Sequence, residues 1–264
     1  MHKKRDFSMD TLKAEQIQDR MQITLQRGKA NPINSTLVNE LRQAIAELKQ
    51  NDSIKGAILT GQPRYFSAGL DVVELYGYDA DTMRQFWQDF TALILEMISC
   101  PKPIVAAISG HSPAGGCVLA LCCDQRLMAE GPYRIGLNEV PVGIVVPPTI
   151  YYLYAAAMGE GKAYHHLLNG SLMLPEEALA EGLVHQVLPL EALQEQAEER
   201  LNHYLSMNAT AWGTSKLLLR QSLLSQLRGD FDQLFGPVLK HWWSAEFRAQ
   251  LEGMVERLKA PRLA

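Results

Sequence analysis

The stretch HSPAGGCVLALCCD, residues 111 to 124, combines a proline, a pair of glycines and a short apolar run. Pro113 favours the first turn of a helix, and Gly115 and Gly116 predict that a small, tightly packed helix begins there. Unpaired N–H groups at a helix start, with no side chain to shield them, attract negative charge. Taken alone, the glycine pair is equally well explained by close helix packing.

The segments on either side of this stretch alternate between strands and helices. Strands are predicted at residues 21–27, 55–60, 104–108, 125–129, 134–137 and 183–188. Helices are predicted after residues 34–36 and after Asp81, where apolar residues recur at helical spacing. The pattern after about residue 145 is mostly helical. The sequence therefore predicts an α/β core with a helical tail, without a linker that would separate two domains.

Composition narrows the class of protein. The 264 residues are 47% hydrophobic and 20% charged, as in a globular protein with a substantial core. The net charge is -4 and no Lys/Arg-rich run occurs, which argues against a nucleic-acid partner. No apolar run reaches the roughly 18 residues of a membrane span. Residues 1–20 lack the apolar core of a secretory signal and are expected to be a mobile lead-in.

The cysteines indicate a reducing compartment. The four are Cys100, Cys117, Cys122 and Cys123, all at the borders of apolar runs, and no C-x-x-C occurs. We interpret them as buried free thiols rather than zinc ligands, and we expect a cytoplasmic protein without a metal site. Nucleotide-binding fingerprints and the G-x-S-x-G nucleophile elbow are also absent.

A second glycine-bearing stretch, YFSAGLD, spans residues 65 to 71 and follows the strand at 55–60. Gly69 allows a sharp backbone turn and the close approach of a ligand to the main chain. Asp71 is a candidate N-cap for a helix that begins at Val72. Alone, this stretch is no more than a strand-to-helix turn.

A single carboxylate stands in the apolar stretch GLNEVPVGIVVPP, residues 136 to 148. Glu139 in such surroundings costs several kcal/mol unless it is paired, protonated or used in catalysis. Two backbone N–H donors, one from each glycine stretch, form an oxyanion hole if they meet, and a nearby carboxylate then moves a proton. Together these groups are suited to enolising a thioester.

In this combination the chain resembles the crotonase (enoyl-CoA hydratase/isomerase) superfamily, over about residues 21–259. The motifs FSAGLD, CPKPIVAAISGHSPAGGCVLALCCD, GLNEVPVG and LPEEALAEGLVHQVLP occur in the family's order and spacing. The segments PAGGC and IGLNE are most similar to the Δ3,Δ2-enoyl-CoA isomerases of the mitochondrial type. The resemblance implies a spiral of ββα units in a core at residues 21–200 and a helical C-terminal region at 201–264 for oligomerisation. It also implies a homotrimer or a dimer of trimers.

The resemblance also implies the site. The family's oxyanion donors fall on the backbone N–H groups of Ala68 and Gly115, and its second catalytic glutamate falls on Glu139. The implied substrate-binding residues are Ala68, Gly69, Leu70, Asp71, Val72, Gly115 and Asn138. The expected ligand is an acyl-CoA, with no metal and no further cofactor.

One departure from the family points to a particular reaction. Hydratases use two glutamates, and the first falls on Val118, one helical turn beyond Gly115. With valine there, no second group activates water, whereas one carboxylate suffices to move a proton from C2 to C4 of a 3-enoyl-CoA. Desolvation would raise the pKa of Glu139. Three alternatives stay open: a hydrolase, a weak enoyl-CoA hydratase, and a non-catalytic acyl-CoA-binding protein.

Overall fold

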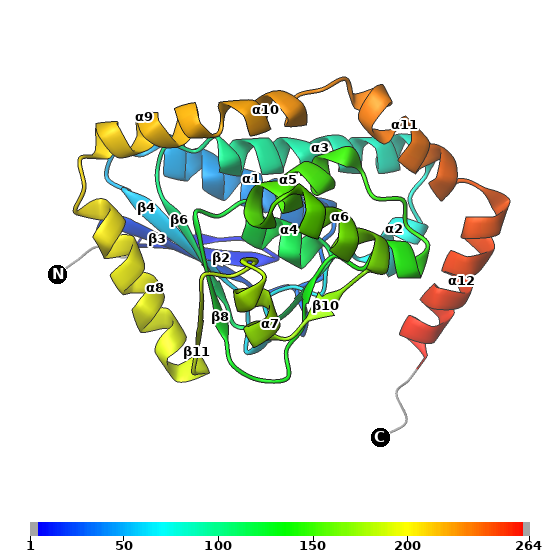
Figure 1. Cartoon of the computed structure of the whole chain (residues 1–264), viewed down its shortest axis with the longest axis horizontal. Helices are drawn as coiled ribbons and strands as arrows, with labels where there is room; N and C mark the ends of the chain where they lie inside the picture. The colour runs from blue at the N-terminus through cyan, green and yellow to red at the C-terminus, as the bar shows by residue number, and fades with distance from the viewer. Residues whose placement is uncertain (1–4, 261–264) are drawn as a thin grey trace.

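Residues 5–260 are described by the computed structural model, with side chains from Met9 onward, and form two sheets surrounded by helices (Figure 1). The larger sheet has seven strands in the order β1-β2-β3-β4-β6-β8-β11. The strands are Arg5–Ser8 (β1), Leu12–Ile17 (β2), Arg20–Leu25 (β3), Gly56–Thr60 (β4), Ile104–Ile108 (β6), Gln125–Ala129 (β8) and Gln186–Leu188 (β11). The first three pair antiparallel, and β3, β4, β6, β8 and β11 pair in parallel.

A smaller sheet carries the turns that lead into the helices. Its order is β10-β9-β7-β5, and its strands are Leu172–Met173 (β10), Ile135–Gly136 (β9), Gly110–Pro113 (β7) and Arg64–Tyr65 (β5). The helices that follow in the chain are Val72–Tyr76 (α2), Ala80–Ile98 (α3), Gly115–Leu121 (α4) and Pro148–Met158 (α5). The chain thus repeats one pattern: a strand of the large sheet, a short strand of the small sheet, and a helix. This is the ββα spiral that the resemblance implies.

Both faces of the large sheet are covered, because its strands alternate their side chains between two apolar layers. Ala57 and Leu59 point into the main core with helices α1 (Ser35–Gln50) and α3. Ile58 and Val105 point the other way, into a smaller cluster with α8 (Leu190–Leu205), which lies beside the strands of the large sheet at the left of Figure 1.

The prediction of a mobile lead-in at residues 1–20 is wrong for residues 5–20; residues 1–4 lie outside the described residues. β1 and β2 form an antiparallel hairpin at the edge of the large sheet. Leu12 and Ala14 are fully buried, and Leu12 pairs with Leu25 of β3. Leu12 and Ala14 alternate with Lys13, so β2, which lies between β1 and β3, buries one face in the main core.

The C-terminal third is helical, as expected. It comprises α6 (Glu160–Asn169), α7 (Pro175–Ala180), α8, α9 (Ala209–Leu219), α10 (Gln221–Leu227), α11 (Phe231–Trp242) and α12 (Ala245–Lys259). The expected boundary at residue 201 falls inside α8. A buried ion pair between Lys216 Nζ of α9 and Asp124 Oδ2, 2.7 Å apart, fastens these helices to the core. Oligomerisation through this region stays a prediction; its residues 261–264 lie outside the described residues.

The four cysteines are free and buried, which confirms the interpretation of their sequence positions. Within residues 5–260, no cluster of His, Cys, Asp and Glu side chains could hold a metal ion. Over the same range, no helix is both long enough and apolar enough to cross a lipid bilayer.

Candidate active site

The two glycine stretches meet because β5 pairs in parallel with β7, which places the chain after Tyr65 beside the chain after His111. At the meeting point Gly69 has φ +86°, a conformation that side chains rarely adopt. A β-carbon at Gly69 would lie 3.1 Å from Pro113 O and 3.2 Å from Gly115 N. Only glycine lets the two backbones approach so closely.

Gly115 is the first residue of α4, and its N–H group is directed out of the helix start. Within residues 5–260 no acceptor pairs with this N–H. The preceding Ala114 has φ +49°, which costs an alanine about 1–3 kcal/mol, and its own N–H donates to Gly136 O at 2.8 Å. This fixed turn orients the Gly115 N–H, so the expectation of a free donor at Gly115 agrees with the geometry.

The second expected donor, Ala68, needs correction. The Ala68 N–H donates to Ala30 O at 2.8 Å and is therefore occupied by the fold. The neighbouring Leu70 behaves differently: Gly69 O and Asp71 N both bond to Ile33, which turns the Leu70 N–H to the opposite side. No acceptor in the described part of the chain pairs with the Leu70 N–H. The free donor beside Gly115 is thus Leu70.

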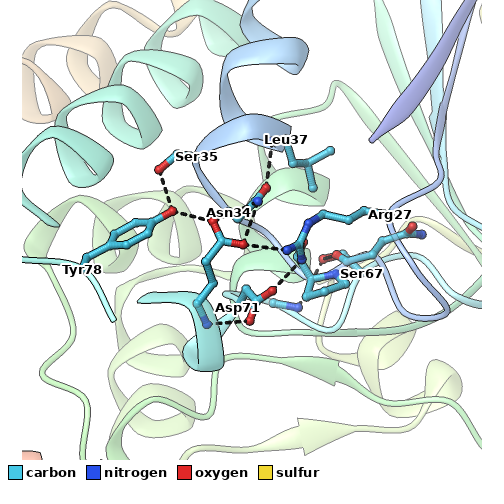
Figure 2. A network of polar contacts seen from close by, with 11 residues as sticks. Arg27, Asn34, Ser35, Leu37, Ser67, Asp71 and Tyr78 are labelled. Carbon is cyan, nitrogen blue, oxygen red and sulfur yellow. Dashed lines mark hydrogen bonds and ion pairs between the residues drawn. The ribbon is translucent and has the colours of Figure 1, made fainter. Parts of the chain in front are cut away.

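A polar network holds this loop in place (Figure 2). Arg27 of the loop after β3 forms ion pairs with Asp71 Oδ2 at 2.6 Å and with Glu74 Oε2 at 2.8 Å. Tyr78 donates to Glu74 Oε1 at 2.7 Å. Asp71 Oδ1 accepts from the Glu74 N–H at 3.0 Å, so the predicted N-cap of α2 is confirmed. The carboxylate of Asp71 thereby orients the loop instead of facing a ligand.

Beside the two free donors lies a cavity of about 140 Å³. Its walls come from the FSAGLD loop, α3, α4, the stretch around Glu139, α5 and α12. They are almost entirely apolar, and the lining residues are Ala68, Leu70, Val72, Trp87, Phe90, Ala114, Gly115, Val118, Asn138, Glu139, Val142, Ile144, Pro147, Ile150 and Met254. Gly69 and Asp71, both expected to bind substrate, do not line it.

Glu139 is the one acidic residue among those that line the cavity. It follows β9 and begins the 3₁₀ turn Val140–Val142 (η1), with φ -63° and ψ -47°. Although the residue is partly exposed as a whole, its Oε2 atom is buried, with no hydrogen-bond partner in the described structure. Burial raises the pKa of Glu139 from its ordinary value of 4.5 to about 7. A carboxyl group with this pKa is suited to accept and return a proton near neutral pH.

The cavity has two free N–H donors and one desolvated carboxylate on its walls. The family to which the sequence matches is consistent with this geometry. The model of the enoyl-CoA hydratase/isomerase family matches residues 16–261. The chain belongs to this family.

Relatives in the enoyl-CoA hydratase/isomerase family include both kinds of enzyme. The mitochondrial enoyl-CoA delta isomerase 1 of Mus musculus is 35% identical over 77% of this chain and 71% of its own. The crystal structure of human mitochondrial delta3-delta2-enoyl-CoA isomerase has a TM-score of 0.92, with 29% identity over 96% of this chain and 100% of its own. An enoyl-CoA hydratase from Bacillus halodurans has a TM-score of 0.84, with 25% identity over 92% of this chain and 100% of its own.

In this member of the family the other wall of the site is apolar. Val118 is 1% exposed and lines the cavity one turn of α4 beyond Gly115. No second carboxylate lines the cavity. The nearby Cys117 has its pKa raised by burial, which keeps it a neutral thiol. Val118, which stands where hydratases of the family have a glutamate, thus faces the same cavity as Glu139.

Sequence reasoning missed several lining residues, because their apolar side chains are indistinguishable in the sequence from ordinary core residues of a helix. Trp87 of α3 and Met254 of α12 show only an ordinary apolar spacing in the sequence. Phe90 of α3 also lines the cavity, whereas the α5 tyrosines Tyr151, Tyr152 and Tyr154 do not. The apolar residues of α12 predict that one face of the helix is packed, but the sequence does not show that Met254 reaches the cavity.

Proposed function

We propose that this enzyme is a Δ3,Δ2-enoyl-CoA isomerase, which converts a 3-enoyl-CoA into the trans-2-enoyl-CoA. The observation that carries the proposal is the pair Glu139 and Val118: one buried carboxylate and one valine on the walls of the same cavity. A proton shuttle needs one such group, whereas addition of water needs a second group to activate the water.

The proposed reaction is a 1,3-shift of one proton. The thioester oxygen accepts from the N–H groups of Leu70 and Gly115, and Glu139 removes a proton from C2. The electron pair of the C2–H bond delocalises into the thioester, and the two N–H dipoles stabilise the negative oxygen that forms. The same carboxyl group returns the proton to C4, which leaves the double bond between C2 and C3. No electrons are gained or lost, so the proposed step requires no redox cofactor, and the two N–H groups supply the stabilisation of the oxyanion without a metal.

Incubation with trans-3-enoyl-CoA and with trans-2-enoyl-CoA tests the proposal. We expect rapid formation of the conjugated 2-enoyl thioester, followed by its ultraviolet absorbance, and slow hydration of the 2-enoyl substrate. A hydratase is the second candidate, because the hydratase of Bacillus halodurans shares this fold. Rapid hydration without isomerisation would indicate that the protein is a hydratase and not an isomerase. Binding without proton exchange in D₂O would indicate a non-catalytic acyl-CoA-binding protein.

The pH dependence of kcat/KM should follow the protonation of Glu139. Since burial raises its pKa to about 7, the carboxyl group is protonated below that pH and cannot act as a base. We expect kcat/KM to rise with pH, with a midpoint near 7, and to fall about tenfold per pH unit in the acidic limb. Initial rates between pH 5 and 9 measure this profile. A midpoint near 4.5, the ordinary value for glutamate, would mean that the carboxylate is solvated during turnover.

A second carboxylate should admit hydration. The Val118→Glu variant is expected to hydrate trans-2-enoyl-CoA at a rate at least about tenfold above the parent, because the new group lies on the cavity wall and can activate water. Its isomerase activity should fall, since two carboxyl groups in one apolar site raise each other's pKa. Val118→Gln is the control, with the same shape but no base. Equal hydration by both variants would contradict this role of the second carboxylate.

An acyl-CoA as substrate is consistent with the family, and its acyl group would occupy the apolar cavity. Assembly as a homotrimer or a dimer of trimers stays a prediction, which sedimentation velocity would test. The mouse and human relatives are named as mitochondrial proteins, and a cytoplasmic location for this chain also stays a prediction.

A further inference from the structure

The loop that carries Glu139 is bound by side chains from the C-terminal helices. His241 of α11 donates its Nε2–H to Gly143 O, at 2.8 Å, because a carbonyl oxygen can only accept. Gln250 of α12 donates its Nε2–H to Val142 O at 3.3 Å. These helices lie about 100 residues further along the chain than the loop.

Neither of these two carbonyl groups accepts a backbone hydrogen bond within the loop. Inside the loop, Val142 N and Ile144 N both donate to Glu139 O, at 3.1 and 2.9 Å, and Gly143 N donates to Val140 O at 2.9 Å. Gly143 has φ +82°, so the chain turns sharply just after η1. A β-carbon at Gly143 would lie 2.8 Å from Gln250 Oε1. The turn and the C-terminal helix are therefore in close contact.

His241 is itself held in one orientation. Its ring packs against Phe247, with ring centroids 4.9 Å apart, and Phe247 is 1% exposed. α12 is also fastened to α2 on the other side of the cavity, because Arg248 lies 3.9 Å from the ring centroid of Tyr76 and donates to Tyr76 O at 3.1 Å. Met254 of the same helix lines the cavity. The C-terminal helices thus contact both the oxyanion side and the base side of the site.

We infer that His241 and Gln250 are positioning residues for Glu139: they hold its loop by the carbonyl groups of Gly143 and Val142. The inference rests on the proposed function, in which Glu139 moves the proton. Neither side chain lines the cavity, so neither touches the reacting atoms. Their effect passes through the backbone of the loop and appears in the rate of proton transfer, not in the affinity for the acyl-CoA.

The test compares His241→Leu with His241→Gln, which keeps a donor of similar reach. We expect His241→Leu to lower kcat about 10- to 100-fold, the effect of a small misplacement of a catalytic group, and to leave the Kd for a saturated acyl-CoA within about threefold. His241→Gln should recover most of the rate. Amide hydrogen exchange at residues 142–144 should be faster in His241→Leu than in the parent.

Ser244→Ala is the matched control, because Ser244 caps α12 by accepting from the Phe247 N–H but does not contact the loop. It should lower stability with little change in kcat. Equal losses of kcat in Ser244→Ala and His241→Leu, or unchanged loop exchange in His241→Leu, would overturn the positioning role. Absence of isomerisation by the parent would overturn the proposed function instead, and loop exchange would still test the contact by His241.

Discussion

The Glu139→Gln variant is expected to lose isomerase activity by about 10²–10⁴-fold in kcat, the contribution of a positioned acid–base group. Among the residues that line the cavity, Glu139 is the one acid, and the amide of glutamine keeps its shape without its basicity. Binding of a saturated acyl-CoA should stay within about threefold of the parent, because the apolar walls and the two N–H donors are unchanged. Stopped assays with trans-3-enoyl-CoA and calorimetric titration measure the two quantities.

The same variant should be more stable than the parent above neutral pH. The pKa of Glu139 is raised from 4.5 to about 7 in the folded state, so the folded protein binds this proton more tightly than the unfolded chain. Stability from this group is therefore fully present below pH 4.5 and is lost as the pH rises through 7. The loss approaches about 3 kcal/mol at pH 8, and glutamine avoids it.

Urea unfolding at pH 8 and pH 4.5 should show a stability gain for Glu139→Gln at the higher pH and little difference at the lower one. Isomerisation at near the parent rate would mean that another base acts, and the mechanism given above would be wrong. Loss of activity together with loss of acyl-CoA binding would instead indicate that Glu139 shapes the cavity.

Much of the fold could be predicted because its signals are local. The apolar strands at 55–60 and 104–108 and the glycine pair at the start of α4 depend on neighbours in the sequence. The hairpin of β1 and β2 could not be recognised with the same ease, because a mixed segment such as Leu12–Ile17 becomes a strand by pairing with its neighbours β1 and β3.

The part of the candidate site that could be predicted consists of residues whose type and neighbours in the sequence alone indicate a chemical role. A lone carboxylate in an apolar stretch marks Glu139, and the burial of its Oε2 atom agrees with that interpretation. Which backbone N–H is free cannot be read from the sequence, since it depends on the pairing of the FSAGLD loop with Ile33. For the same reason, the contact of His241 with Gly143, 98 residues away, left no signal in the sequence.

The proposal that Leu70, instead of Ala68, is an oxyanion donor leads to the second large effect. Replacing Leu70 by its α-hydroxy acid analogue turns one amide into an ester and deletes one N–H group while it keeps the side chain. Because this N–H has no acceptor in the described protein, we expect kcat to fall about 10²–10³-fold, the usual effect of losing one oxyanion donor. The stability loss should be small, since the ester weakens only the bond that Gly69 O accepts from Ile33 N.

The matched control is the same replacement at Ala68, which deletes an N–H that donates to Ala30 O at 2.8 Å. Losing this internal hydrogen bond should lower the free energy of unfolding by about 1 kcal/mol and should change kcat little. Chemical denaturation and single-turnover rates separate the two effects. The reverse pattern, with the larger rate loss at Ala68, would restore the sequence-based assignment. It would also mean that the loop turns its backbone when the thioester binds, because the Ala68 N–H must then leave Ala30 to reach the substrate.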